Sequence, residues 1–113
     1  MSVQKSSTSP FGSRTRTRVL LTLYQLEDSF PRELARTLGT PLFGVQRALL
    51  SLESDGLVAG RSVGRTRLYR LNPRFFAARQ LRGLIEALAQ ADDELRERVS
   101  NIRRRPRAAG KAL

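Results

Sequence analysis

The stretch PRELARTLGTPLFGVQRALLSLESDGLVAGRSVGRTRLYRLN, residues 31–72, decides the fold. It opens with a predicted short helix over residues 31–39, because Pro31 suits a first helical turn and Gly39 suits the left-handed residue after the last one. A second helix is predicted over residues 41–55, where apolar residues recur at helical spacing. Two short helices joined by a turn that contains glycine are typical of a helix-turn-helix.

Residues 56–72 predict a β-hairpin directly after the second helix. Apolar residues near both ends of this segment suit two strands, and Gly64-Arg65 marks the turn between them. Asn72-Pro73 then stops the second strand, and this pair also suits the start of a following helix.

Upstream of the helix-turn-helix, a helix is predicted from Ser13 to Asp28. Ser13 suits the N-cap position, and an apolar stripe follows at helical spacing. Ser29-Phe30 is compatible with a very short strand. The stripe consists of Val19, Leu20, Leu23, Tyr24 and Leu26.

Downstream, the sequence predicts a long helix from about Pro73 to Arg103. Apolar residues recur there every seven positions, which is the period of a coiled coil, so we predict that this helix pairs two copies into a homodimer. Two alternatives stay open: the helix folds back onto its own domain, or it breaks near Ala91 and Asp92 and Asp93 cap a new helix. The predicted dimerisation residues are Leu81, Leu84, Ile85, Leu88, Leu95, Val99 and Ile102.

The charge of the chain favours a polyanionic partner. Twenty-one Lys and Arg residues against 10 Asp and Glu give a formal net charge of +11. Nucleic acid is the commonest polyanion that such a protein meets. The span from Gly56 to Ile85 holds seven arginines and no acidic residue, so the hairpin lies in the most basic part of the chain.

The residue inventory argues against catalysis. The chain has no Cys and no His, which excludes disulfides, thiolate zinc sites, thiol redox chemistry and imidazole acid–base chemistry. Both lysines, Lys5 and Lys111, lie near the chain ends, so a Ser–Lys nucleophile pair is not expected. We therefore expect no enzyme, no cofactor and no metal site.

Four segments resemble one branch of the ArsR-like transcriptional regulators, among the winged helix-turn-helix proteins of the ArsR and MarR type. The resemblance covers roughly residues 11–73. It implies a mainly α fold with a small β-hairpin (α+β), and double-stranded DNA as the ligand. The segments are FGSRTRTRVLLTL (11–23), RELARTLG (32–39), VQRALLSLESDGLV (45–58) and VGRTRLYRLNP (63–73).

The resemblance also implies how DNA would be bound. The recognition helix, residues 41–55, enters the major groove, and the wing, residues 57–71, tracks the backbone or the minor groove. Metal sensing is not carried over, because its Cys and His ligands are missing. Arg14 and Arg16, at the start of the first helix, either touch phosphates or are only solvated. The implied contacts are Leu42, Phe43, Gln46 and Arg47 in the groove and Arg61, Arg65 and Arg67 on the wing.

These observations predict one folded domain between two tails. Residues 1–12 and 104–113 are poor in large apolar groups and are expected to be disordered. Residues 13–73 form the expected winged helix-turn-helix DNA-binding domain, and residues 74–103 form the long C-terminal dimerisation helix. A regulator of this kind is expected to bind its DNA site as a homodimer and sequence-specifically.

An alternative function stays open for the same fold. Leu42, Phe43 and Leu50 are apolar where a DNA-reading helix usually presents polar side chains, so the helix could instead dock on a protein partner, as in an adaptor. No apolar run approaches the roughly 18 residues that a membrane span requires, and no secretion signal is recognised. We therefore expect a cytoplasmic, nucleoid-associated protein without a membrane partner.

Overall fold

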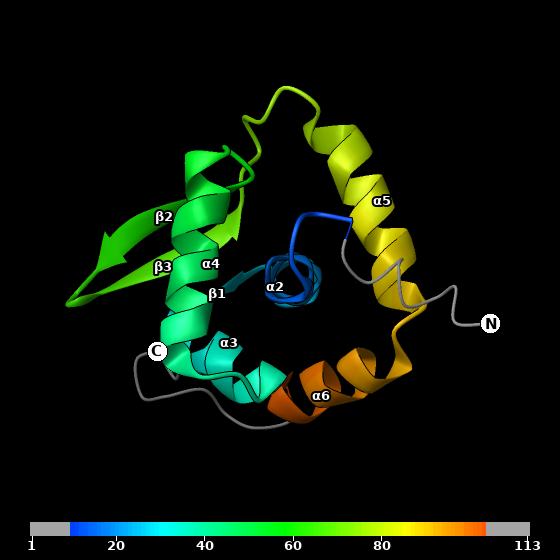
Figure 1. Cartoon of the computed structure of the whole chain (residues 1–113), viewed down its shortest axis with the longest axis horizontal. Helices are drawn as coiled ribbons and strands as arrows, with labels where there is room; N and C mark the ends of the chain where they lie inside the picture. The colour runs from blue at the N-terminus through cyan, green and yellow to red at the C-terminus, as the bar shows by residue number, and fades with distance from the viewer. Residues whose placement is uncertain (1–9, 104–113) are drawn as a thin grey trace.

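The computed structural model describes residues 10–103 and shows a mainly helical chain with one small antiparallel sheet (Figure 1). Five helices and three strands lie within this range. The tail predicted over residues 104–113, and most of that over residues 1–12, lies outside the described residues. The elements are α2 (Arg14–Leu26), β1 (Asp28–Ser29), α3 (Pro31–Leu38), α4 (Leu42–Ser54), β2 (Val58–Val63), β3 (Thr66–Leu71), α5 (Ala78–Gln90) and α6 (Asp93–Arg103).

The hairpin and the short first strand make a single sheet in the order β1-β3-β2. Strands β2 and β3 are paired from Val58↔Leu71 to Val63↔Thr66. The turn between them places Gly64 at φ +63°, a conformation that glycine adopts without a steric penalty. The far end of this hairpin projects away from the helices, as a wing does (Figure 1).

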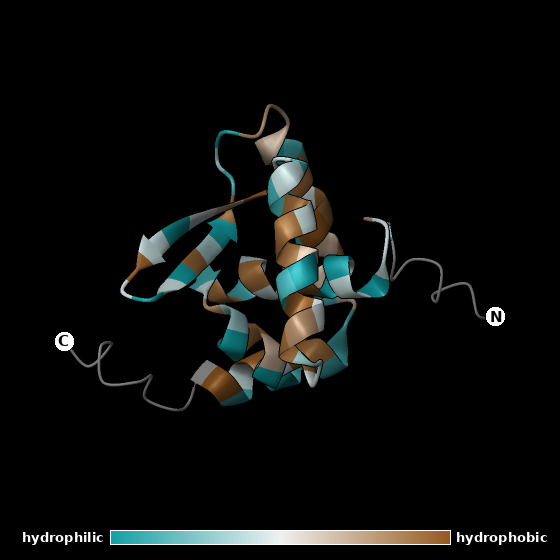
Figure 2. Ribbon diagram, turned by 60° about the vertical axis from the view of Figure 1, so that its left-hand side comes forward, coloured by the Kyte–Doolittle hydropathy of each residue, from teal (hydrophilic) through white to brown (hydrophobic). Residues whose placement is uncertain are grey.

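Helix α2 forms the centre of the core, and the other four helices surround it (Figure 1). Its side chains Val19, Leu20 and Leu23 are completely buried. The predicted cap is confirmed, because the Ser13 hydroxyl accepts a hydrogen bond of 3.0 Å from the backbone N–H of Arg16. Hydrophobic and hydrophilic residues alternate along the helices (Figure 2), as expected for helices with one buried face.

The helix-turn-helix is confirmed as α3 and α4. Pro31 occupies the first turn of α3, and Gly39 ends the helix in the left-handed conformation at φ 64°. The backbone N–H groups of Gly39 and Thr40 then bond back into the last turn. This sharp stop lets the chain turn into α4 after only three residues, Gly39 to Pro41.

The predicted continuous helix from Pro73 to Arg103 is wrong. Helix α5 ends at Gln90, and the Asp92 carboxylate caps α6 by accepting a hydrogen bond of 3.0 Å from the N–H of Leu95. The break near Ala91, one of the two open alternatives, is thus found, and α6 packs back against α2 and α3 of its own domain, as the other alternative described. Neither helix is long and apolar enough to span a membrane, and the same holds for the other helices of residues 10–103.

This break changes the surroundings of the predicted dimerisation residues. Ile85, Leu95 and Val99 are buried in the chain's own core. Leu81, Leu88 and Ile102 are partly buried against the same core, and Leu84 is exposed. A single heptad interface along residues 81–102 is therefore absent from this part of the chain.

The segment between the sheet and α5 is a turn and not the predicted helix start. The Asn72 carboxamide accepts a hydrogen bond from the N–H of Arg74 and donates one to the carbonyl of Gly56, at 3.0 and 2.9 Å. Helix α5 begins only at Ala78. The intervening turn carries Phe76, whose side chain is 92% exposed.

Candidate nucleic-acid interface

The outer face of α4 presents four of the residues that the sequence singled out. Val45, Leu49 and Leu52 turn into the core, so the opposite face of the helix meets solvent. Gln46 and Arg47 are exposed there. Leu42 differs from the expectation, because it is half-buried and packs against the core. The exposed large apolar residues of this face are Phe43 and Leu50, with 68% and 63% of their surface accessible.

Phe43 and Arg47 form one unit on this face. The Arg47 guanidinium carbon lies 5.6 Å from the centre of the Phe43 ring, within the range of a cation–π interaction. This contact holds the Arg47 side chain over the first turn of α4. A guanidinium in this position can still donate its remaining N–H groups to a base edge or a phosphate.

Two of the three predicted wing arginines project from the hairpin. Arg61 lies on β2 and Arg65 lies in the turn, and both are exposed. Within residues 10–103, neither forms an ion pair. Their charges are therefore available for an anionic ligand.

The third wing arginine, Arg67, is engaged in contacts with other residues of the chain, although 43% of its side chain stays accessible. One of its terminal nitrogens lies 2.9 Å from the Glu53 carboxylate on α4 and donates to the Gly60 carbonyl at 2.9 Å. Its guanidinium also lies 5.6 Å from the centre of the Tyr69 ring. Hydrogen bonding to Tyr69 and the charge of Glu53 raise the pKa of Arg67 further. Arg67 therefore ties the wing to α4, and a phosphate contact would have to replace this arrangement.

Gly60 makes room for the Arg67 arrangement. A Cβ atom at this position would lie 2.7 Å from the Tyr69 ring and 2.8 Å from the Arg67 guanidinium, which is too close for either group. The absence of a side chain at residue 60 thus lets the ring and the guanidinium cross β2. Sequence reasoning missed both Gly60 and Glu53, since their role depends on a contact between separate elements.

Arg16 is likewise held by contacts with other residues of the chain. Its Nε donates to the Phe11 carbonyl at 2.7 Å, and its guanidinium bonds the Ser51 hydroxyl and lies 2.9 Å from the Asp55 carboxylate. Only 19% of its side chain is accessible. Arg16 thereby fixes the segment before α2 to the C-terminal end of α4, whereas Arg14 is exposed.

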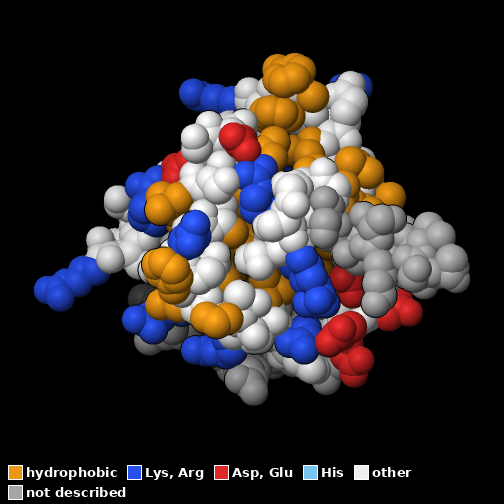
Figure 3. All heavy atoms as spheres, viewed as in Figure 1, with side chains coloured by type: hydrophobic (Ala, Val, Ile, Leu, Met, Phe, Trp, Pro, Cys, Tyr) orange, Lys and Arg blue, Asp and Glu red, His pale blue; other side chains and the backbone are white. Residues whose placement is uncertain are grey.

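A groove of about 540 Å³ lies between α4 and the hairpin. Leu49 and Tyr69, both buried, form its base, and Phe43, Leu50, Arg47 and Arg65 stand at its margins. Hydrophobic and basic side chains interleave over α4 (Figure 3). Among residues 10–103, no Asp or Glu lines this groove. Its chemistry suits a ligand that is both anionic and partly apolar.

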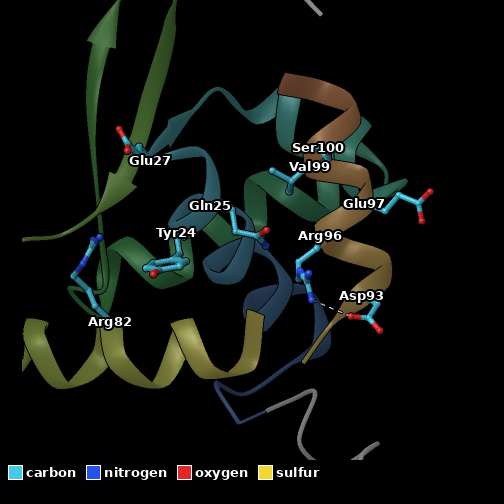
Figure 4. Close-up of a pocket in the computed structure, with 9 residues that line it drawn as sticks. All are labelled: Tyr24, Gln25, Glu27, Arg82, Asp93, Arg96, Glu97, Val99 and Ser100. Atoms are coloured by element: carbon cyan, nitrogen blue, oxygen red, sulfur yellow. Dashed lines mark hydrogen bonds and ion pairs between the residues drawn. The ribbon is translucent and has the colours of Figure 1, made fainter. Parts of the chain in front are cut away.

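A second hollow, of about 940 Å³, lies between α2, α5 and α6 (Figure 4). Arg82 stacks over the Tyr24 ring at 5.4 Å, and Arg96 is paired with Asp93 at 3.0 Å. Burial and the charge of Glu86 raise the pKa of Tyr24. This open hollow carries charges of both signs. Over residues 10–103, no group of three or more His, Cys, Asp or Glu side chains is placed to hold a metal ion.

Comparisons with known proteins establish the fold. No family model matches the sequence. No curated protein matches it either. The chain is similar to the crystal structure of the adhesin competence repressor AdcR from Streptococcus pyogenes, with a TM-score of 0.58 and 17% sequence identity. The match covers 98% of this chain and 79% of that one. The predicted winged-helix fold is thereby confirmed, while the ArsR-like branch stays a prediction.

Proposed function

We propose that this chain is a non-enzymatic, DNA-binding transcriptional regulator that acts on double-stranded DNA at the nucleoid. The observation that carries the proposal is the shared surface of α4 and the wing, where Arg47, Arg61 and Arg65 are exposed. A basic surface of this kind supplies the sequence-independent part of DNA affinity. The similar fold belongs to a protein that is a repressor by name, which agrees with this role.

The proposed mechanism divides the contacts between α4 and the wing. Helix α4 would lie in the major groove, where Gln46 can pair with an adenine edge and Arg47 with a guanine edge or a phosphate. Phe43 can contact a thymine methyl group. Arg61 and Arg65 would reach phosphates or the narrow minor groove beside the site.

The proposal includes a homodimer, formed through the outer face of α5 and not through one long heptad helix. The exposed Leu84 lies there with the small residues Gly83, Ala87 and Ala91, and α5 carries its charged residues elsewhere on its surface. Phe76 precedes this helix and adds exposed apolar area. An apolar helix face that no other element of residues 10–103 covers suits antiparallel packing against the same helix of a second copy.

Selection of bound fragments from random duplex DNA, followed by anisotropy titrations at several salt concentrations, tests the proposal. We expect enrichment of a two-fold symmetric motif and an affinity that falls as salt rises. Single-stranded DNA of the same composition serves as the control. The proposal fails if no motif is enriched and if duplexes bind no better than the single strands.

A further inference from the structure

The groove between α4 and the hairpin has more apolar character than DNA binding requires. Phe43 and Leu50 expose 68% and 63% of their surfaces to water. They stand seven residues apart on one helix face, about 10 Å along its axis. Between and beside them lie Arg47 and Arg65, and the nearby Glu53 is already neutralised by Arg67.

Nucleic acid would complement the arginines of this groove but would leave most of its apolar side chains without a partner. Phosphates pair with the arginines, but a hydrated backbone leaves most of the apolar surface uncovered. An amphipathic helix with apolar residues at i, i+3 or i+4, and i+7 matches the two-turn spacing of Phe43 and Leu50. Acidic residues beside that apolar face would meet Arg47 and Arg65.

We propose that this groove binds an acidic amphipathic helix of a partner protein, and that this helix competes with DNA for the same arginines. The competition rests on the proposed DNA-binding function, whereas the docking surface itself does not. Leu50 belongs to the peptide contact alone, since it lies outside the set of side chains assigned to DNA. A partner of this kind would release the regulator from its operator without any small-molecule effector.

A designed peptide of about 15 residues tests the docking surface. It carries leucine at i, i+4 and i+7, glutamate on the flanking positions and alanine elsewhere, and its control carries lysine in place of each glutamate. We expect the acidic peptide to bind at least about tenfold more tightly than the lysine peptide in an anisotropy titration. It should also displace a labelled duplex.

Two variants of the full chain separate specific docking from general attraction to a basic protein. L50Q should weaken peptide binding about fivefold to tenfold and leave DNA affinity within about twofold, because it removes apolar area and no charge. F76Q, at an exposed aromatic residue that does not line the groove, is the control and should leave peptide binding unchanged. Circular dichroism checks that both variants are folded.

The outcomes distinguish this inference from the proposed function. Equal binding of both peptides, or an unchanged peptide affinity for L50Q, overturns the docking surface. Duplex binding without peptide binding overturns it and leaves the DNA-binding function intact. Peptide binding that depends on Leu50, without any duplex binding, supports the docking surface while the DNA-binding function fails.

Discussion

Replacing Leu95 by alanine distinguishes a core residue from a dimer contact. Leu95 lies on α6, is completely buried and belongs to the same apolar cluster as Ile85 and Val99. Truncating a leucine in such surroundings removes its transfer free energy and leaves a cavity, which together cost about 3–5 kcal/mol. For a domain of this size that is a large part of the total free energy of unfolding, about 5–15 kcal/mol.

Leu84 supplies the matched control on the neighbouring helix. Its side chain is 47% exposed, so Leu84→Ala should cost the monomer less than about 1 kcal/mol. If the outer face of α5 forms the dimer, the same substitution should raise the dimer dissociation constant. The two leucines are thus expected to affect different equilibria.

Urea denaturation followed by circular dichroism measures the unfolding of the chain. Light scattering over a range of protein concentrations measures the dissociation of the dimer. Leu95→Ala should lower the urea midpoint at every protein concentration and leave any dimerisation constant of the folded chain unchanged. The reasoning is refuted if Leu95→Ala keeps the wild-type midpoint and yields monomers. That result would place Leu95 between two chains.

Three further predictions concern the proposed DNA contacts. Arg65→Ala should flatten the slope of log affinity against log salt by about 0.9, whereas Arg67→Ala should change it less, since that charge is already paired; equal slopes for the two variants would contradict this. Gly60→Ala should weaken DNA binding and shift the Tyr69 ring resonances in an NMR spectrum, because the new Cβ displaces the ring; an unchanged spectrum would contradict the clash. Gln46→Ala should lose about 1–3 kcal/mol of discrimination at one base pair while non-specific affinity persists, as measured by competition between duplexes.

The local chemistry of the sequence was sufficient for much of the fold. Pro31 marks the start of α3 and Gly39 marks its end, because each residue acts within a single turn of backbone. Ser13 caps α2, and Gly64 sits in the left-handed turn of the hairpin, for the same local reason. Signals of this kind need no knowledge of the tertiary structure.

The heptad pattern led to the wrong prediction of one long dimerisation helix. Its period shows that the apolar residues are covered, but not whether the same chain or a second copy covers them. Leu88 and Leu95 stand seven residues apart, yet they lie on different helices, and after the two-residue break at Ala91 and Asp92 the helix α6 packs against α2 and α3. The stripe that predicted a partner helix is mostly covered by the chain's own α2 and α3. Only Asp92 and Asp93, good N-cap residues within an apolar repeat, indicated the break.

The roles of the arginines were equally hard to read from the sequence. Arg67 and Arg65 are both basic residues of a predicted wing, but only Arg67 lies within reach of Glu53, which is 14 residues away. Arg16 is held by Ser51, which is 35 residues away. Such partners become visible only when the packing of separate elements is known.

The link from Arg16 to Ser51 and Asp55 bears on attempts to reprogram this protein. The far end of α4 is anchored to the start of α2, so residues 51–55 stabilise the fold and lie outside the proposed DNA-reading surface. A graft that imports residues 42–50 from another protein of this fold would keep this anchor, whereas one that imports residues 42–55 would replace both Ser51 and Asp55 and lose it. Donor segments that extend to position 55 therefore need a compatible side chain at position 16, and the three sites should be exchanged as a set.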